Sequence, residues 1–386
     1  MHSRKLNSLI KIILIFTVSS NILFCVTSLY YISNCNGIVT KDNEEHTKTA
    51  GWNEGEATWN NVNYRNGGIL SEWKLGNLSA KLSSYHDRDH VKTVCSELPS
   101  NPGGRMNISR LVQPEDVFNS SSLKLVRPGG HYVPGCLERE TVAIIVPYRD
   151  RERHLQTLLY HLHTFLQRQQ HQYAVFVVEM AYPTQFNRGI LANIGFLTAK
   201  EILNFTCYII HDVDLLPVDD RNHYKCSNNP RHLSVSSSKY GYKLPYGHYN
   251  GGIIAFTPGQ FLKINGFSNA YFGWGKEDDD LHKRILNAGY KIDRPDPTIG
   301  VYEEIARQDV QDFSNPDNPM KDSLYLRAEK RFRRDGVNNV LFKRLALEFL
   351  PLYTWVYVNT SELTVMKMMK HIDPGLEETF ARVKPL

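Results

Sequence analysis

Three continuous apolar runs stand out in the middle of the chain. Thr141–Tyr148, Tyr173–Glu179 and Cys207–His211 are rich in β-branched and aromatic residues and show no alternation with polar ones. Such runs are typical of strands buried on both faces. Between them, apolar residues repeat at helical spacing from Leu155 to Phe165 and again from Asn187 to Ile202. This order of strands and helices predicts an α/β fold with a mainly parallel sheet, which binds ligands at the carboxyl ends of its strands.

A separate apolar run near the N-terminus predicts a membrane helix. Ile12 to Ile32 carries no charge and reaches the roughly twenty residues that span a bilayer. A secretory signal peptide is the alternative, but the run is long for one and no small-x-small cleavage site follows it. Basic residues precede the run and acidic residues follow it, so the N-terminus is expected in the cytosol and the remainder in the lumen. We expect a cytosolic tail at 1–11 and a signal anchor at 12–33.

The rest of the chain divides by composition. Residues 34–93 are polar and show no sustained period, which indicates a flexible luminal stem. The density of apolar residues rises from Cys95, so we expect a globular domain at 94–360 and a C-terminal tail at 361–386. Four cysteines of this domain can form disulfides in an oxidising lumen, and the sequence leaves three pairings open. Five glycosylation sequons fit a luminal location: Asn77, Asn107, Asn119, Asn204 and Asn359.

Composition excludes several classes of protein. With 386 residues, 41% hydrophobic and 22% charged, the chain can bury one sizeable core and is neither disordered nor fibrous. The net charge of +5 is small and the basic residues are scattered along the chain, which argues against a nucleic-acid partner. Lys330 to Arg334 is the densest basic run, and we interpret it as a solvated helix face.

Two acidic side chains directly follow the third apolar run. In a strand, Asp212 and Asp214 point to the same side, at the edge where such a sheet binds ligands. Their oxygens suit Mg²⁺ or Mn²⁺, and such an ion can neutralise a diphosphate leaving group. A turn or a helix cap is the alternative interpretation, but the buried strand that precedes the pair favours a metal site.

A second acidic stretch follows a tryptophan between two glycines. Trp274 lies between Gly273 and Gly275, and Lys276 separates it from four carboxylates at 277–280. The glycines free the backbone, an indole face stacks on sugar rings, and a neighbouring carboxylate could take a hydroxyl proton. Acidic residues also favour the first turn of a helix, and both interpretations agree with the helical spacing that follows.

Together these motifs resemble the animal β-1,4-galactosyltransferases over residues 95–358. The resemblance implies a GT-A fold, a UDP-sugar donor, Mn²⁺ or Mg²⁺ as cofactor, a single-pass type II position in the Golgi membrane, and disulfides Cys95–Cys136 and Cys207–Cys226. The motifs that carry it are Pro147–Arg151, Phe186–Arg188, Asp212–Asp214, Pro230–His232, Tyr249–Gly252, Asn265–Phe267, Gly273–Asp280 and Asp335–Asn338.

The resemblance also implies a role for each site residue. Asp214 would hold the metal, and Asp278 would be the catalytic base of an inverting displacement. Glu277 and Asp279 would orient sugar hydroxyls, and Trp274 would close over the sugars on a mobile loop. For the arginines a solvated helix start is the alternative. The residues expected at the donor are Pro147, Tyr148, Arg149, Arg151, Phe186, Arg188, Asp212, Val213, Lys239, Tyr249 and Gly252.

Donor and acceptor follow from the same comparison. The phenol ring of Tyr249 fills the space that a 2-acetamido group would need, so we expect UDP-galactose as donor. The resemblance implies a terminal N-acetylglucosamine as acceptor, in β-1,4 linkage. A β-1,4-N-acetylgalactosaminyltransferase and a xylose-directed galactosyltransferase are the alternative enzymes. A luminal protein that binds UDP or glycans without turnover is the alternative class. Monomer and homodimer both remain open.

The sequence departs from the family in three places. The family completes its metal site with a Met-x-x-His segment, whereas Gly300 to Asp309 contains neither residue. Aligned from Gly300, Glu304 and Arg307 take those places, and a short insertion would instead bring in Asp309. Glu304 and Asp309 are therefore the expected replacement ligands, because carboxylate oxygens suit these ions. Lys276 occupies a position that is commonly small, and residues 321–325 on the acceptor side diverge.

Overall fold

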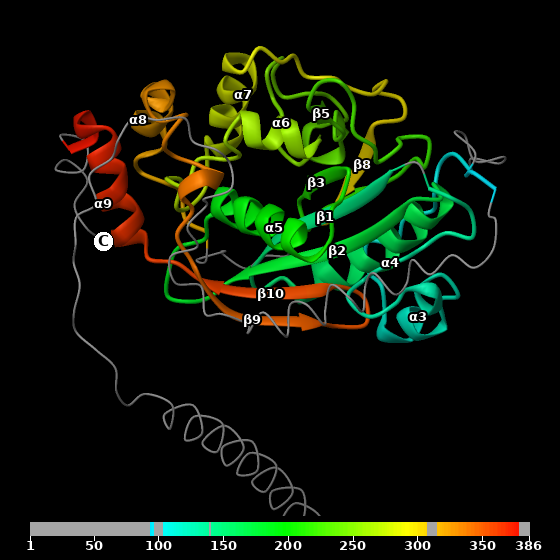
Figure 1. Cartoon of the computed structure of the whole chain (residues 1–386). Coiled ribbons are helices and arrows are strands. Elements are labelled where there is room, and N and C mark those ends of the chain that lie inside the picture. Colours follow the sequence, from blue (N-terminus) through cyan, green and yellow to red (C-terminus); the bar gives the residue numbers. More distant parts are fainter. Residues whose placement is uncertain (1–92, 96–102, 139, 307–314, 378–386) are drawn as a thin grey trace, which may run out of the picture. The chain divides into compact units, whose positions relative to one another are not determined.

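A seven-stranded mixed sheet forms the centre of the part of the chain that the structure, a computed structural model, describes: residues 93–95, 103–138, 140–306 and 315–377. Its strand order is β5-β7-β3-β1-β2-β10-β9. The four central strands are parallel, and the outer strands pair antiparallel. A second, three-stranded sheet has the order β4-β8-β6, and β4 is the strand that follows β3 along the chain. Figure 1 shows β3, β1, β2, β10 and β9 of the larger sheet in this order.

The elements have the following bounds. The strands are β1 (Thr141–Tyr148), β2 (Gln172–Met180), β3 (Cys207–His211), β4 (Leu215–Pro217), β5 (Arg231–His232), β6 (Ser236–Ser237), β7 (Ile253–Phe256), β8 (Val301–Glu304), β9 (Lys343–Phe349) and β10 (Thr354–Asn359). The helices are α3 (Pro114–Asn119), α4 (Glu152–Arg168), α5 (Arg188–Ile202), α6 (Pro258–Lys263), α7 (Glu277–Asn287), α8 (Lys321–Leu326) and α9 (Glu362–Ile372).

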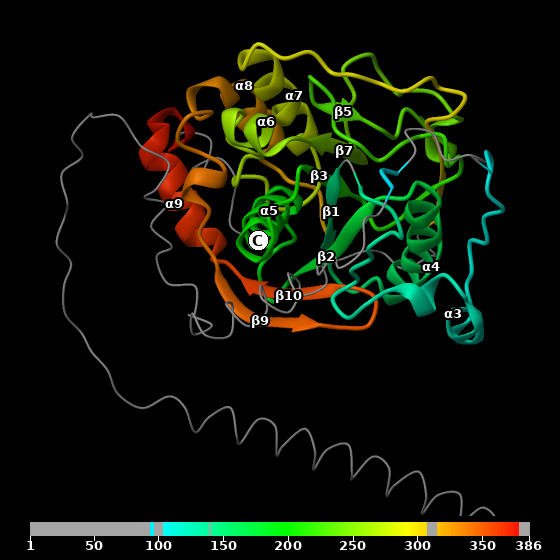
Figure 2. The ribbon, with the colours of Figure 1, turned by 45° about the vertical axis from the view of Figure 1, so that its right-hand side comes forward.

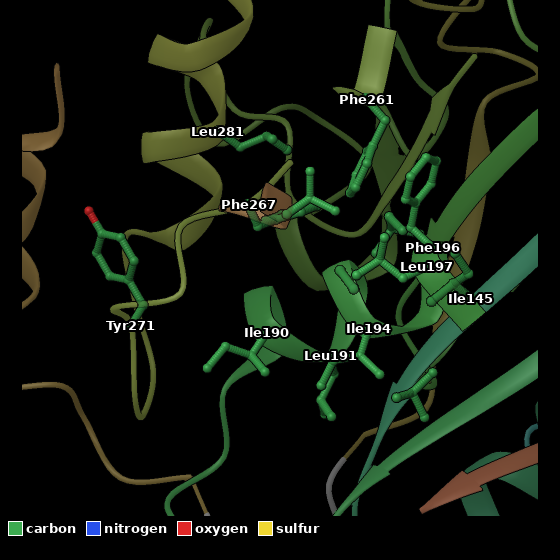
Figure 3. Packing of buried hydrophobic residues seen from close by; sticks show 14 of the residues in the cluster. Ile145, Ile190, Leu191, Ile194, Phe196, Leu197, Phe261, Phe267, Tyr271 and Leu281 are labelled. Carbon is green, nitrogen blue, oxygen red and sulfur yellow. The ribbon is translucent and has the colours of Figure 1, made fainter. Parts of the chain in front are cut away.

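Helices cover both faces of the sheet, as Figure 2 shows for α4 and α5. Alternate residues of β1 point to opposite faces: Ile144 packs with the α4 side and Ile145 with the α5 side. Ile190, Leu191 and Ile194 of α5 belong to the same buried cluster as Ile145 (Figure 3). Burial on both faces explains why these strands have continuous apolar sequences.

The predicted strands and helices are confirmed, but the acidic pair is not part of a strand. β3 ends at His211, and Asp212 to Asp214 form a turn before β4. The two carboxylates therefore reach the sheet edge through a turn, and not through the strand alternation that the sequence suggested. The expected mainly parallel sheet is confirmed for its four central strands.

Two predictions near the C-terminus need correction. Over the described residues 361–377 of the expected tail, the chain is part of the globular domain, because Val365 and Met369 of α9 are buried against the main core. The prediction of a solvated basic face at 330–334 holds for Lys330, Arg333 and Arg334, which are exposed. It is wrong for Arg331, which is completely buried and pairs with Asp280 and Asp335. The negative charges of these two carboxylates compensate the buried guanidinium, which would otherwise be costly to remove from water.

The predicted disulfides are confirmed, whereas the predicted membrane helix lies outside the described residues. Cys95–Cys136 and Cys207–Cys226 are both bonded, as expected. The expected signal anchor at 12–33 and nearly all of the stem at 34–93 lie outside the described residues. Within the described ranges, no helix combines the length and the apolar composition needed to cross a bilayer.

Candidate active site

A cleft of about 630 Å³ opens at the carboxyl ends of the central strands. Pro147 at the end of β1 and Asp212 after β3 form part of its floor. β7 runs antiparallel to β3, with Ile253 opposite His211, so Gly252 reaches the same edge. The loop around Trp274 and the start of α7 form another part of its lining.

Arginines from two helix starts extend into this cleft. Arg149 is buried, donates to the Thr184 carbonyl, and lies with its guanidinium 5.6 Å from the Phe186 ring centroid. Arg188 begins α5, donates through Nε to Asp212 at 2.7 Å and through Nη2 to the Gly252 carbonyl at 3.0 Å. A solvated helix start is therefore excluded for these residues. Guanidinium groups in such a position suit the oxygens of a diphosphate.

Asp212 and Asp214 have different electrostatic surroundings. Burial raises the pKa of Asp212, and the positive charge of Arg188 opposes that shift. Asp214 accepts a hydrogen bond of 2.8 Å from Arg151 Nη1. Both carboxylates line the cleft, so either can contact a bound nucleotide sugar.

Asp214 and Glu304 are the described residues that fit the expected divalent ion. β8 pairs with β4 so that Glu304 lies opposite Leu215, and the Ile305 amide donates to the Asp214 carbonyl at 2.8 Å. Two carboxylates, together with water and phosphate oxygens of a substrate, are a suitable ligand set for Mg²⁺ or Mn²⁺. Among the described residues no group of three or more His, Cys, Asp or Glu could hold a metal. Glu304 is ion-paired with Lys239 at 3.1 Å.

The acidic stretch begins α7 on the wall of the cleft. Glu277, Asp278 and Asp279 all line it, whereas Asp280 is completely buried beneath. Burial, reinforced by repulsion from Asp279, raises the pKa of Asp278 to about 6. Burial, reinforced by repulsion from Asp278, raises the pKa of Glu277 to about 7. Near neutral pH, Asp278 is therefore mainly ionised and able to accept a proton. Its pKa also lies close to the working pH, which is where a general base is most effective.

Glycines allow the backbone to approach Asp278 and the donor side closely. A Cβ on Gly251 would lie 2.6 Å from Asp278 Oδ2 and 2.7 Å from the Tyr249 hydroxyl. The Gly251 carbonyl is fixed by the buried His232, whose Nε2 donates to it at 2.9 Å. Tyr249 and Asp278 are therefore neighbours across one glycine, which brings the residue expected to choose the donor next to the expected base.

The tryptophan loop is tied to the segment before α8. Trp274 donates its amide to the Pro316 carbonyl at 2.7 Å and accepts at its carbonyl from the Asn318 amide at 3.0 Å. Its side chain is 57% exposed, and Lys321 Nζ lies 4.9 Å from its ring centroid. An exposed indole on the wall of a cleft can stack on a sugar ring.

The structure brings together all but two of the predicted site residues. Tyr148 is buried beneath the cleft, where its hydroxyl accepts from the Arg151 amide at 3.1 Å, so it positions that arginine and does not line the cavity. Asp309 lies outside the described residues. The predicted residues that line the cleft are Pro147, Arg149, Arg151, Phe186, Arg188, Asp212, Val213, Asp214, Lys239, Tyr249, Gly252, Trp274, Glu277, Asp278, Asp279 and Glu304.

Several residues that line the cleft were not among the predicted site residues, and three of them matter for its geometry. Tyr246 donates its hydroxyl to Asp279 Oδ1 at 3.0 Å, and Gly251 and Lys321 also line the cavity. The adjacent glycines at 251 and 252 were a detectable signal, because paired glycines often mark a close backbone approach. Tyr246 lies in a loop whose sequence has no periodicity, so nothing in the sequence indicated that it would line the cleft.

Comparisons with known proteins agree with this geometry. Residues 95–227 match the family model described as the N-terminal region of glycosyl transferase group 7, and residues 231–308 match the model described as the N-terminal domain of galactosyltransferase. The two matches together cover more than half of the chain.

Curated relatives and a solved structure agree with these matches. β-1,4-Galactosyltransferase 3 of Cricetulus griseus is 47% identical over 231 residues, which are 59% of this chain and 58% of the relative. β-1,4-Galactosyltransferase 1 of Mus musculus is 43% identical over 235 residues, or 61% of this chain and 58% of the relative. The chain thus matches 58% of the length of these relatives.

The solved structure is a mutant of Drosophila β-1,4-galactosyltransferase 7 in complex with manganese, UDP-Gal and xylobiose. It is similar to this chain at 27% identity and a TM-score of 0.51, over 59% of this chain and 98% of its own. The chain belongs to the β-1,4-galactosyltransferase family.

Proposed function

We propose that the chain is an inverting galactosyltransferase that moves galactose from UDP-galactose to a terminal N-acetylglucosamine in β-1,4 linkage. The observation that carries this proposal is that Asp278 and Asp214 line one cleft together with the arginines expected at the donor. The homologous galactosyltransferases and the solved relative with UDP-Gal support the donor.

The proposed reaction is a single displacement. Asp278 accepts the proton of the acceptor hydroxyl, whose oxygen forms the new bond to C1 of galactose while the bond from C1 to the UDP oxygen breaks. Arg188 and Arg151 reduce the negative charge that develops on UDP, because their guanidinium groups face the cleft beside Asp212 and Asp214. Attack and departure on opposite faces of C1 invert the anomeric centre.

Metal dependence is part of the proposal. Asp214 and Glu304 would hold Mn²⁺ or Mg²⁺, which when bound supplies Lewis-acid stabilisation of the leaving diphosphate. The manganese in the solved Drosophila relative supports this choice of ion. Lys239 and Arg151 pair with these carboxylates, so a metal must compete with them.

Location is proposed on the sequence alone. An uncharged run at 12–32 with basic residues before it and acidic residues after it supports a type II anchor in the Golgi membrane, with the catalytic domain in the lumen.

A donor and acceptor screen tests the function. The purified protein is given UDP-galactose or UDP-N-acetylgalactosamine with N-acetylglucosamine or xylose glycosides, with and without Mn²⁺. We expect the fastest transfer from UDP-galactose to N-acetylglucosamine, and stimulation by Mn²⁺. Faster use of the acetamido donor would refute the role of Tyr249. UDP binding without turnover of any pair would identify a binding protein and contradict the enzyme proposal.

A further inference from the structure

Lys276 has an unfavourable place in the fold. Its backbone is left-handed, with φ 70° and ψ −2°, a conformation that costs free energy for any residue with a side chain. It also caps the N-terminus of α7, where the helix dipole disfavours a positive charge. Glycine would avoid both costs. A lysine in this position, on the wall of the cleft, therefore indicates a task for its ammonium group.

Lys276 is one of three lysines whose ammonium groups lie on the aromatic rings of Tyr325 and Trp274. Its Nζ lies 4.9 Å from the Tyr325 ring centroid, and Lys283 Nζ lies 3.9 Å from the same centroid. Lys321 Nζ lies 4.9 Å from the Trp274 ring centroid. Lys276 precedes α7, Lys283 lies within it, and Lys321 begins α8. These two helices are neighbours in Figure 1 and are joined by the bond from Lys283 Nζ to the Tyr325 carbonyl.

The cluster joins stretches that are far apart in the sequence. The Trp274 backbone bonds to Pro316 and Asn318 just before α8, and Lys276 and Lys321 both line the cleft. The structure thus brings two lysines to the wall of the cleft, beside the indole on which a sugar would stack. Ammonium groups in this place can pair with an anionic substituent of that sugar.

Nearby acids balance only part of this positive charge. Asp279 pairs with Lys276 at 3.4 Å and also accepts from the Tyr246 hydroxyl at 3.0 Å, and Lys321 pairs with Asp317. Lys283 has no carboxylate partner among the residues that the structure describes. Two ammonium groups held against one aromatic ring repel each other, and a shared anion would stabilise both.

We propose that this lysine cluster, in which Lys276 and Lys321 line the cleft and Lys283 shares the Tyr325 ring with Lys276, is an acceptor subsite for a glycan that carries an anionic substituent: a sulfate, a phosphate or a carboxylate. The sugar ring stacks on Trp274, Asp278 takes its hydroxyl proton, and the anion of the same or the adjacent sugar pairs with the lysines. The inference rests on the proposed transferase function for its consequence in turnover, but not for the binding itself.

Acceptor competition tests the subsite. Transfer is measured to an N-acetylglucosamine glycoside that is unmodified, 6-sulfated, 6-phosphorylated or linked to a uronic acid, and the four arms identify the anion. We expect kcat/KM for at least one anionic acceptor to exceed the neutral one about tenfold, mainly through KM, and the preference to shrink as salt rises. Equal or better use of the neutral acceptor at low salt would overturn the proposal.

Matched variants separate charge from structure. Lys276→Gln and Lys321→Gln should each reduce the ratio of anionic to neutral kcat/KM, and Lys276→Arg should retain it. Lys263→Gln is the control, because Lys263 Nζ also lies on an aromatic ring, 4.6 Å from the Tyr290 centroid, but outside the cleft lining. A ratio that changes as much in the control as in the cluster variants would contradict the assignment.

Binding distinguishes failure of the subsite from failure of the proposed function. Calorimetry of the four glycosides, with UDP present, requires no turnover. Tighter binding of an anionic glycoside without transfer to any acceptor would support the subsite and refute the transferase. Transfer to the neutral glycoside with no gain in binding from the anion would refute the subsite and leave the transferase intact.

Discussion

Replacing Asp278 by asparagine should abolish transfer and stabilise the fold at the same time. Asparagine keeps the shape of the side chain but cannot accept the proton, so kcat should fall by about 10² to 10⁴ while UDP still binds. In the wild type, the pKa of Asp278 is raised to about 6. Transfer should therefore decline below that pH, to about a tenth of its plateau one pH unit lower.

The gain in stability follows from the same pKa. Burial raises it from the ordinary value of 3.8 to about 6, so the folded protein binds a proton more tightly than the unfolded chain does. The free energy of unfolding falls as pH rises through this window, and the full cost is present above pH 6. The shift corresponds to about 3 kcal/mol, and partial exposure reduces it to about 1–2 kcal/mol. Asp278→Asn removes this cost at pH 7, and gives no gain below pH 4.

Urea unfolding at pH 7.5 and at a pH below 4, alongside initial transfer rates, measures both effects. Glu115→Gln is the control, because Glu115 is exposed on α3 and outside the cleft lining; it should change neither quantity. A variant that transfers galactose at near wild-type rate would remove Asp278 from the role of base. A variant that is less stable than the wild type at pH 7.5 would refute the account of its pKa.

Three further changes test other parts of the site. Gly251→Ala should lower kcat about 100-fold with UDP affinity retained, because the new Cβ would lie 2.6 Å from Asp278 Oδ2; steady-state kinetics would detect it. Arg331→Leu should destabilise the protein by about 3–5 kcal/mol in urea unfolding, because it removes one of the two buried arginines that neutralise the buried Asp280 and Asp335. Lys239→Gln should tighten Mn²⁺ binding in the absence of UDP, measured by calorimetry, because it releases Glu304 from its ion pair; unchanged or weaker binding would argue against Glu304 as a ligand.

The sequence predicts the core of the fold because burial on both faces leaves a strong pattern. Thr141–Tyr148 and Cys207–His211 are strands at the bounds that their apolar runs suggested. The turn at Asp212 escaped prediction, because two acids after a strand look the same in sequence whether the strand continues or ends. The burial of Arg331 depends on Asp280, which lies far away in the sequence, so the local composition alone predicted an exposed side chain.

The candidate site was predictable as a set of residues but not as a set of contacts. Family motifs named most of the residues that line the cleft, but not those of the loop around Tyr240 to His248. They could not show that Lys239 pairs with Glu304, or that Lys276 and Tyr325 meet. Those contacts depend on the pairing of β4 with β8 and on the position of α8 beside α7, which are tertiary features without a local signature.

The most direct test of the central claim is the configuration of the product. Proton NMR follows the anomeric signal while the protein acts on UDP-galactose and an N-acetylglucosamine glycoside. If Asp278 activates the acceptor opposite a leaving UDP in the same cleft, the first product formed is a β-galactoside linked to the 4-hydroxyl. An α-galactoside, or free galactose alone, would contradict the account.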